Sequence, residues 1–179
     1  LAPLENFFRK MASINIVGTK GDKSDPAFRY KMPRLVAKIE GRGNGIKTGT
    51  STLEKKKHVV VVTTNTKRAV NTVIVNASDI AESLHRPPSH FTKFFGCELG
   101  AQSKWTEETD RSVVNGAHAT AEMQALVDKY CDLFVLCPTC TYPETRLKIK
   151  SSKKEIWHVC KACGEKNMCD MSHKLCVYI

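Results

Sequence analysis

The stretch CPTCTYPETRLKIKSSKKEIWHVCKACG, residues 137–164, decides the fold of the C-terminal part of the chain. It holds two Cys-x-x-Cys pairs, Cys137/Cys140 and Cys160/Cys163, separated by 19 residues. A spacing of two residues lets both thiolates of a pair bind one ion, and two pairs supply the four ligands of a tetrahedral zinc site. The segments RLKIK and EIWHV predict a β-hairpin that brings the pairs together. We therefore predict a zinc-ribbon domain over residues 135–179.

Two other cysteine chemistries fit this stretch poorly. A redox Cys-x-x-Cys motif needs one pair in a thioredoxin-like βαβ setting, which the sequence lacks. A base deaminase needs an upstream His-x-Glu, whereas His118 is followed by Ala-Thr. Four cysteine ligands leave the ion no open position, so the zinc is predicted to be structural and to contribute roughly 10–16 kcal/mol of apparent binding free energy. The remaining cysteines are interpreted as core or strand residues: Cys97, Cys131, Cys169 and Cys176.

The composition favours a polyanionic partner. The 179 residues carry a formal net charge of +10, and the pI is about 9.3. RNA, DNA or an anionic membrane would satisfy this charge, but no apolar run approaches the roughly 18–20 residues of a membrane span. Nucleic acid is thus the predicted partner, with no membrane; a basic surface that serves only solubility is the alternative. Eight cysteines are too few for a disulfide scaffold and indicate a reducing compartment, which we take to be the cytoplasm.

The rest of the chain predicts an α+β fold. Residues 1–24 are interpreted as a flexible N-terminal tail. Residues 25–134 are interpreted as an α/β domain, with a small mixed sheet and packed helices, that precedes the ribbon. The predicted strands are 34–40, 58–64, 72–76 and 110–116, and the predicted helices are 77–85, a short turn at 89–96 closed by Gly96, and one within 117–136. The last carries an apolar stripe typical of a core: Met123, Leu126, Val127, Tyr130 and Phe134.

A basic insertion interrupts the α/β domain at residues 48–71. It carries Lys55, Lys56, Lys57, Lys67 and Arg68 against one acidic residue, Glu54. Such a segment indicates an extruded loop or hairpin, and its charge leads to the hypothesis that Lys55, Lys56 and Lys57 contact ribosomal RNA.

A single arginine, Arg29, lies between two aromatic residues in SDPAFRYKMPRL (24–35). Pro26 and Pro33 keep this stretch out of regular helix. An arginine on such an arm has three possible roles: a residue at the edge of the core, a contact to an RNA phosphate, or a charge inserted into the active site of another protein.

The glycine-rich GRGNGIKT (41–48) resembles a phosphate-binding P-loop but departs from it. A P-loop needs lysine directly after the last glycine, and here Ile46 intervenes before Lys47. We interpret the segment as a mobile basic loop that approaches a phosphate or base through Arg42, Gly43, Asn44 and Gly45; a plain turn is the alternative. The sequence shows no Ser-His-Asp, paired-carboxylate or Cys-His-Asn set, so an independent enzyme is not predicted.

Ten ordered blocks of the sequence resemble the N-terminal domain of eukaryotic translation initiation factor 5, a family related to the beta subunit of initiation factor 2. The blocks run from about Asp25 to Ile179 and include FRYKMPRL, KIEGRGNGIKT, TVIVN, HRPP, FFGCELGAQ, FVLCPTC, PET, CKACG and HKLC.

This resemblance implies a GTPase-activating protein for initiation factor 2 that supports start-codon selection. The implied partners are the gamma and beta subunits of that factor, initiator tRNA, rRNA and mRNA on the small ribosomal subunit, and other initiation factors. Arg29 corresponds to the arginine finger, Lys47 to a lysine implicated in the same activation, and residues 42–45 to a loop near the tRNA and start codon. GTP and magnesium would enter only through the partner GTPase.

The chain also departs from the family. In relatives GIKT runs directly into VIVN, so residues 48–71 stand outside the resemblance, and Phe28 stands where relatives often have tyrosine. The factor's C-terminal helical domain is missing, so we expect the chain to be a fragment. The alternative function is a non-catalytic RNA-binding or scaffold module resembling the beta subunit.

Overall fold

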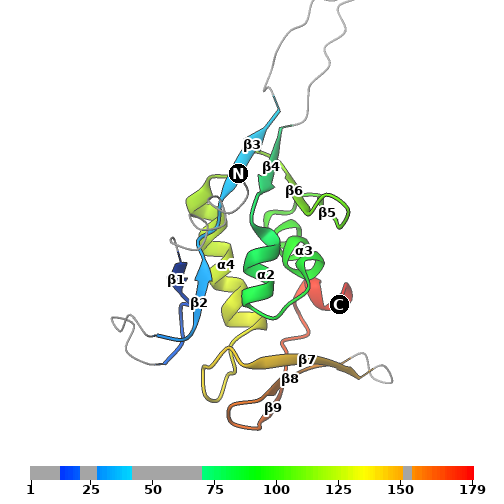
Figure 1. Cartoon of the computed structure of the whole chain (residues 1–179). Coiled ribbons are helices and arrows are strands. Elements are labelled where there is room, and N and C mark those ends of the chain that lie inside the picture. Colours follow the sequence, from blue (N-terminus) through cyan, green and yellow to red (C-terminus); the bar gives the residue numbers. More distant parts are fainter. Residues whose placement is uncertain (1–12, 21–27, 42–69, 151–154) are drawn as a thin grey trace, which may run out of the picture.

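The computed structural model describes residues 13–20, 28–41, 70–150 and 155–179 (Figure 1). Within these ranges the chain combines three α-helices with small sheets, and its four paired cysteines cluster near the C-terminal end. This confirms the predicted α+β class with a C-terminal ribbon. Every pairing among the described strands is antiparallel, however, so the sheet is not mixed as predicted.

A four-stranded sheet forms one wall of the α/β part. Its order is β3-β4-β6-β5. The strands are β3 (Ala37–Glu40), β4 (Asn71–Ile74), β5 (Ser103–Thr106) and β6 (Arg111–Asn115). On β6 the side chains of Ser112 and Val114 are buried while their neighbours are not, as expected for a strand with one face on the core. The predicted strands at 72–76 and 110–116 are confirmed within two residues, whereas 58–64 lies outside the described residues.

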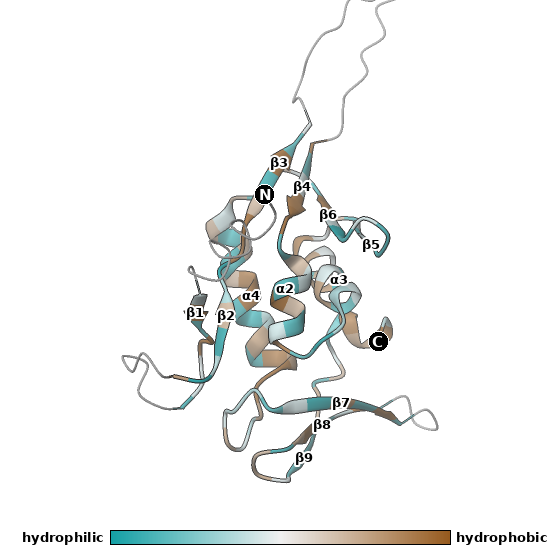
Figure 2. Ribbon diagram, in the orientation of Figure 1, coloured by the Kyte–Doolittle hydropathy of each residue, from teal (hydrophilic) through white to brown (hydrophobic). Residues whose placement is uncertain are grey.

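Three helices cover this sheet and enclose an aromatic core. They are α2 (Ala77–Ser83), α3 (Pro88–Leu99) and α4 (Thr120–Phe134). Phe91 packs edge-on against Tyr130 with ring centroids 5.5 Å apart, and Phe94 packs against Phe134 at 6.1 Å. The predicted stripe on α4 is confirmed as core, since all its members but the half-buried Leu126 are fully buried. Figure 2 shows hydrophobic residues along α2 and α4 and hydrophilic residues at the β5–β6 turn.

The helix α3 is longer than the turn predicted at 89–96. Pro88 occupies its first turn, where a missing N–H costs nothing, and Gly100 ends it with a left-handed φ of 60°. Gly96, predicted to close the helix, lies inside it. A Cβ at Gly96 would lie 2.3 Å from Ser103 Oγ and 2.9 Å from the Ala101 carbonyl oxygen. Glycine is therefore needed here because β5 passes close to the helix, not because the helix stops.

The interpretation of residues 1–24 as a flexible tail is wrong for residues 13–20. Ser13–Asn15 forms strand β1, which pairs with β2 (Lys31–Pro33) so that Ile14 lies opposite Met32. The next residue, Ile16, is only 2% exposed and belongs to the hydrophobic core. The apolar alternation of INIV was underestimated beside its polar surroundings.

The strand predicted at 34–40 is ordered as an extended segment followed by β3. Asn76 holds the extended part: its side-chain amide donates to the Arg34 carbonyl at 2.8 Å and its oxygen accepts from the Val36 N–H at 2.9 Å. Asn76 was considered as a cap of the helix beginning at residue 77, but its side chain makes no cap hydrogen bond to that helix. It replaces the strand ladder at the start of β3 instead.

The ribbon follows α4 and ends against the helices. It comprises β7 (Thr145–Lys150), β8 (Glu155–Cys160) and β9 (Lys166–Met168), and the 3₁₀ helix η1 (Lys174–Val177) comes after it. Leu175 and Cys176 of η1 belong to the same buried cluster as Phe94 and Phe134. Figure 1 shows the ribbon at one end of the molecule and the β3–β4 hairpin at the other. The division into domains at residues 134/135 stays a proposal.

Candidate functional site

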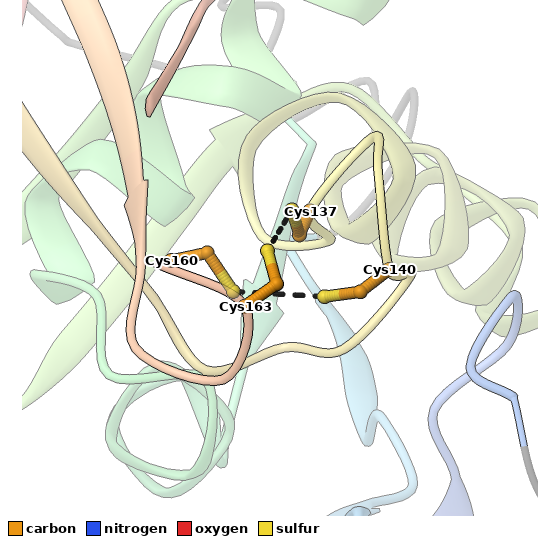
Figure 3. Close-up of side chains that lie close together, drawn as sticks. All are labelled: Cys137, Cys140, Cys160 and Cys163. Atoms are coloured by element: carbon orange, nitrogen blue, oxygen red, sulfur yellow. Dashed lines mark hydrogen bonds between the residues drawn. The ribbon is translucent and has the colours of Figure 1, made fainter. Parts of the chain in front are cut away.

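The four cysteines of the predicted zinc site lie together (Figure 3). All four Sγ atoms are within 4.8 Å of one another; the distance from Cys137 to Cys163 is 3.7 Å and that from Cys140 to Cys160 is 3.6 Å. Zinc–sulfur bonds of about 2.3 Å in a tetrahedron place the sulfurs roughly 3.8 Å apart, so the arrangement fits zinc. We assign these residues as the ligands of a structural ion that completes the ribbon.

Matching turns build the two knuckles. In the first, the Thr141 N–H donates to the Cys137 carbonyl at 2.8 Å. In the second, the Cys160 N–H donates to the Glu165 carbonyl at 3.0 Å. The residue after each pair has a left-handed φ, 59° at Thr141 and 77° at Gly164, and glycine adopts this conformation without strain. The antiparallel pairing of β7 with β8, in which Thr145 lies opposite Cys160, then brings the knuckles together.

The free thiols of this cluster do not ionise alike. At Cys137 desolvation raises the pKa, but the N–H groups of Cys140 and Thr139 stabilise the thiolate, and the pKa falls to about 7. At Cys140 desolvation and the neighbouring thiols raise the pKa to about 12. Binding of a divalent cation therefore requires the loss of at least one thiol proton at neutral pH.

The other four cysteines stay apart from this cluster. Cys131, Cys169 and Cys176 are buried in the hydrophobic core, and Cys97 is half-buried on α3. Burial raises the pKa of Cys131 and that of Cys169 to about 12, so both remain thiols at neutral pH. Their interpretation as core or strand residues is confirmed.

The arm that carries Arg29 lies against the ribbon. The side chain of Arg29 is 80% exposed, with Nη2 3.6 Å from Glu144 Oε1 and Cζ 5.9 Å from the centroid of the Tyr30 ring. The residue beside it is anchored: Tyr30 donates its hydroxyl to Glu144 at 2.9 Å and packs on Tyr142 with centroids 5.6 Å apart. Arg29 is thus presented to solvent from a docked support.

A basic cleft of about 590 Å³ opens between this arm, the end of α2 and the first knuckle. Its lining includes four side chains that are cationic at neutral pH and a single acidic one, Glu144; the cationic residues are Arg29, Lys31, Arg146 and Lys161. Such a surface attracts phosphate groups or an acidic protein surface.

Residues 47–166 match the family model described as the domain found in initiation factors 2B and 5, which covers more than half of the chain. The chain belongs to this family. This initiation-factor domain is 46% identical to mouse eukaryotic translation initiation factor 5 over 156 residues, which are 87% of this chain and 31% of the mouse protein. It is 44% identical to probable eukaryotic translation initiation factor 5 of Schizosaccharomyces pombe over 92% of this chain and 35% of that protein.

The Saccharomyces cerevisiae initiation factor 5 is 39% identical over 93% of this chain and 34% of its own length. The initiation-factor domain described here thus spans about a third of the length of these curated relatives. The resemblance recognised from FRYKMPRL, FFGCELGAQ and CKACG is confirmed. Among the described helices of the domain, none has the length and apolar character needed to cross a bilayer.

Several predicted site residues cannot be placed. The loop residues Arg42, Gly43, Asn44 and Gly45, together with Lys47, Lys55, Lys56 and Lys57, lie outside the described residues. They all belong to the connection between β3 and β4, whose paired ends are Glu40 and Asn71. Their contacts with RNA, and the part of Lys47 in activation, stay predictions.

Sequence reasoning missed the buried Arg86, which joins α2, α4 and the ribbon. Arg86 is only 5% exposed, and burial lowers its pKa from the usual arginine value. All five of its N–H donors are used: Nε and Nη2 donate to the Phe134 carbonyl, Nη2 also to Thr145 Oγ1, and Nη1 to the carbonyls of His85 and Thr145. Phe134 is the last residue of α4, where a cation is favoured by the helix dipole.

Replacement of Arg86 is expected to destabilise the initiation-factor domain strongly. Arg86→Met leaves buried carbonyls of Phe134 and Thr145 without donors, and we expect the free energy of unfolding to fall by about 3 kcal/mol or more. Urea unfolding followed by circular dichroism measures this. The control is Arg111→Met, which breaks an exposed pair with Glu40 and should cost at most about 1 kcal/mol. Equal stability of the two variants would contradict the prediction.

Proposed function

We propose that this domain acts in translation initiation, in the cytoplasm, as an activator of GTP hydrolysis by initiation factor 2. It supplies Arg29 to the GTP and magnesium bound by that partner, in a complex with initiator tRNA on the small ribosomal subunit, and thereby supports start-codon selection. The single observation that supports this most is the geometry of Arg29: the guanidinium is 80% exposed while the next residue is fixed to the ribbon. An arginine that acts in trans has to reach outward and yet be aimed.

The chemistry of GTP hydrolysis explains why an arginine serves here. Negative charge is spread over the phosphate oxygens in the transition state, and a guanidinium delivered by a second protein stabilises it. Such arginines increase the hydrolysis rate by roughly 10³–10⁵-fold. We propose that Lys47 supports the same step and that residues 42–45 and Lys55, Lys56 and Lys57 contact tRNA or ribosomal RNA. The gamma and beta subunits of initiation factor 2, mRNA and other initiation factors complete the proposed set of partners.

The experiment that tests this function compares GTP hydrolysis by the partner with and without this chain. Single-turnover hydrolysis is followed in initiation factor 2 bound to GTP and initiator tRNA on small ribosomal subunits. We expect the chain to raise the rate by at least about 10³-fold, and the chain alone to turn over no GTP. An equal rate with and without the chain would rule out the proposal.

The basic cleft favours a second candidate, a passive RNA-binding or scaffold module. Lys31, Arg146 and Lys161 line the cleft beside Arg29 and would neutralise RNA phosphates without any hydrolysis. Under this alternative, Arg146→Gln with Lys161→Gln weakens binding to small ribosomal subunits and reduces its salt dependence, while Arg29→Lys leaves GTP hydrolysis unchanged. The activator proposal predicts the opposite response to Arg29→Lys.

A further inference from the structure

Glu144 lies where the arm meets the ribbon, and it contacts two successive residues of the arm. Its Oε1 accepts the hydroxyl of Tyr30 at 2.9 Å and lies 3.6 Å from Nη2 of Arg29. Glu144 and Tyr30 are 114 positions apart along the chain, so this contact forms only when the ribbon and the arm are both folded.

The ribbon holds Glu144 in place through the main chain. The Glu144 carbonyl accepts the Lys161 N–H at 2.8 Å, and Lys161 lies between the two cysteines of the second knuckle. The following residue, Thr145, begins β7 and is buried, and its carbonyl accepts a hydrogen bond from Arg86. The carboxylate therefore extends from a backbone that is fixed on both sides.

The two contacts of Glu144 differ in strength. The pair with Arg29 is long and its guanidinium is 80% exposed, so solvent and salt screen it to at most about 1 kcal/mol. The hydrogen bond from Tyr30 is short, and the Glu144 side chain is only 28% exposed. Desolvation, together with this bond, also raises the pKa of Tyr30, so the phenol stays a donor at neutral pH. Glu144 thus binds the arm mainly through Tyr30 and leaves Arg29 available.

We propose that Glu144 is a positioning residue that clamps the arm to the ribbon through the Tyr30 hydroxyl, so that Arg29 enters the partner's GTP site from a fixed support. The inference rests on the proposed function, because it assigns a role in that same step. Glu144 touches neither the nucleotide nor the reacting water; it acts through Tyr30.

The test uses four variants of the full chain in the single-turnover assay with the partner GTPase. Glu144→Ala and Tyr30→Phe each remove the hydrogen bond, and each is expected to lower the maximal stimulated rate by about threefold to tenfold, as one hydrogen bond allows. Glu144→Gln keeps an acceptor oxygen for Tyr30 and should restore at least about half of the wild-type rate. The double variant Tyr30→Phe/Glu144→Ala should be no slower than either single variant, because both remove the same interaction.

Two further measurements separate positioning from a general loss of structure. Amide hydrogen exchange of residues 28–32 should become faster in Glu144→Ala and Tyr30→Phe, while exchange in β7 and β8 and the zinc content stay as in the wild type. The chain concentration that gives half-maximal stimulation should change by less than about twofold. Matched controls are Glu107→Ala, in the exposed β5–β6 turn, and Tyr178→Phe, near the C-terminal end; both should behave as wild type.

The outcomes distinguish this inference from the function beneath it. Full stimulation by Glu144→Ala, unchanged exchange of the arm, or a rate above wild type in Glu144→Gln would each overturn the clamp. The last result would mean that Glu144 restrains Arg29. If wild type fails to stimulate, or if Arg29→Lys equals wild type, the activator function itself is wrong, and the exchange data still decide whether Glu144 fixes the arm.

Discussion

Arg29→Lys is expected to abolish most of the stimulated GTP hydrolysis, with a fall of at least about 10³-fold in the maximal rate. Lysine keeps the positive charge but lacks the planar fork that binds two phosphate oxygens at once. The side chain is 80% exposed and its ion pair with Glu144 is long, so its replacement leaves the fold and the docked Tyr30 intact. Single-turnover hydrolysis and equilibrium binding to the partner are measured on the same samples, and binding should change by less than about threefold.

A matched surface arginine serves as the control for this substitution. Arg111 is exposed on β6 and pairs with Glu40, at the end of the molecule opposite the ribbon (Figure 1). Arg111→Lys should stimulate hydrolysis as wild type does. If Arg29→Lys and Arg111→Lys stimulate equally, the guanidinium of Arg29 has no part in the reaction.

Removal of the metal is expected to unfold the ribbon. The described ribbon strands bury few large apolar side chains, chiefly Ile156, so the roughly 10–16 kcal/mol of apparent zinc binding free energy exceeds what their packing supplies. Cys160→Ser removes one ligand and should abolish stoichiometric zinc and speed amide exchange throughout residues 137–168. Treatment of the wild type with a chelator should do the same, and added zinc should reverse it.

Cys97→Ser provides the comparison for ligand loss. Cys97 is half-buried on α3, away from the four-cysteine cluster, and its replacement should leave one zinc per chain and slow exchange in β8. A Cys160→Ser protein that keeps equimolar zinc and a protected ribbon would show that the four cysteines do not act as a set. Elemental analysis, with exchange measured by mass spectrometry, decides the matter.

The parts that could be predicted from the sequence are those that local patterns determine. The spacing of Cys137, Cys140, Cys160 and Cys163 requires only two short turns and one hairpin, and all of these are present. The apolar stripe of α4 depends on helical periodicity alone, so its burial followed as well. In both cases the residues that make the pattern are close together in the sequence.

The features that could not be predicted depend on contacts between distant residues. Arg86 binds groups 48 and 59 positions away, and Tyr30 meets Glu144 across 114 positions. Gly96 looked like a helix stop, whereas the reason for a glycine there is the approach of Ser103 in space. The strand at Ser13–Asn15 depends on a partner at Lys31–Pro33, beyond an intervening segment, so its short apolar pattern was too weak by itself.

The opposite placement of the ribbon and the β3–β4 hairpin has a mechanical consequence (Figure 1). One close-packed aromatic core lies between them, and such interiors deform little under load. In the proposed complex, a tilt imposed on the hairpin end by RNA would swing the guanidinium at the far end as part of the same lever. Recognition of the start codon and access to GTP would then be coupled by the orientation of one stiff body, with no need for refolding in between.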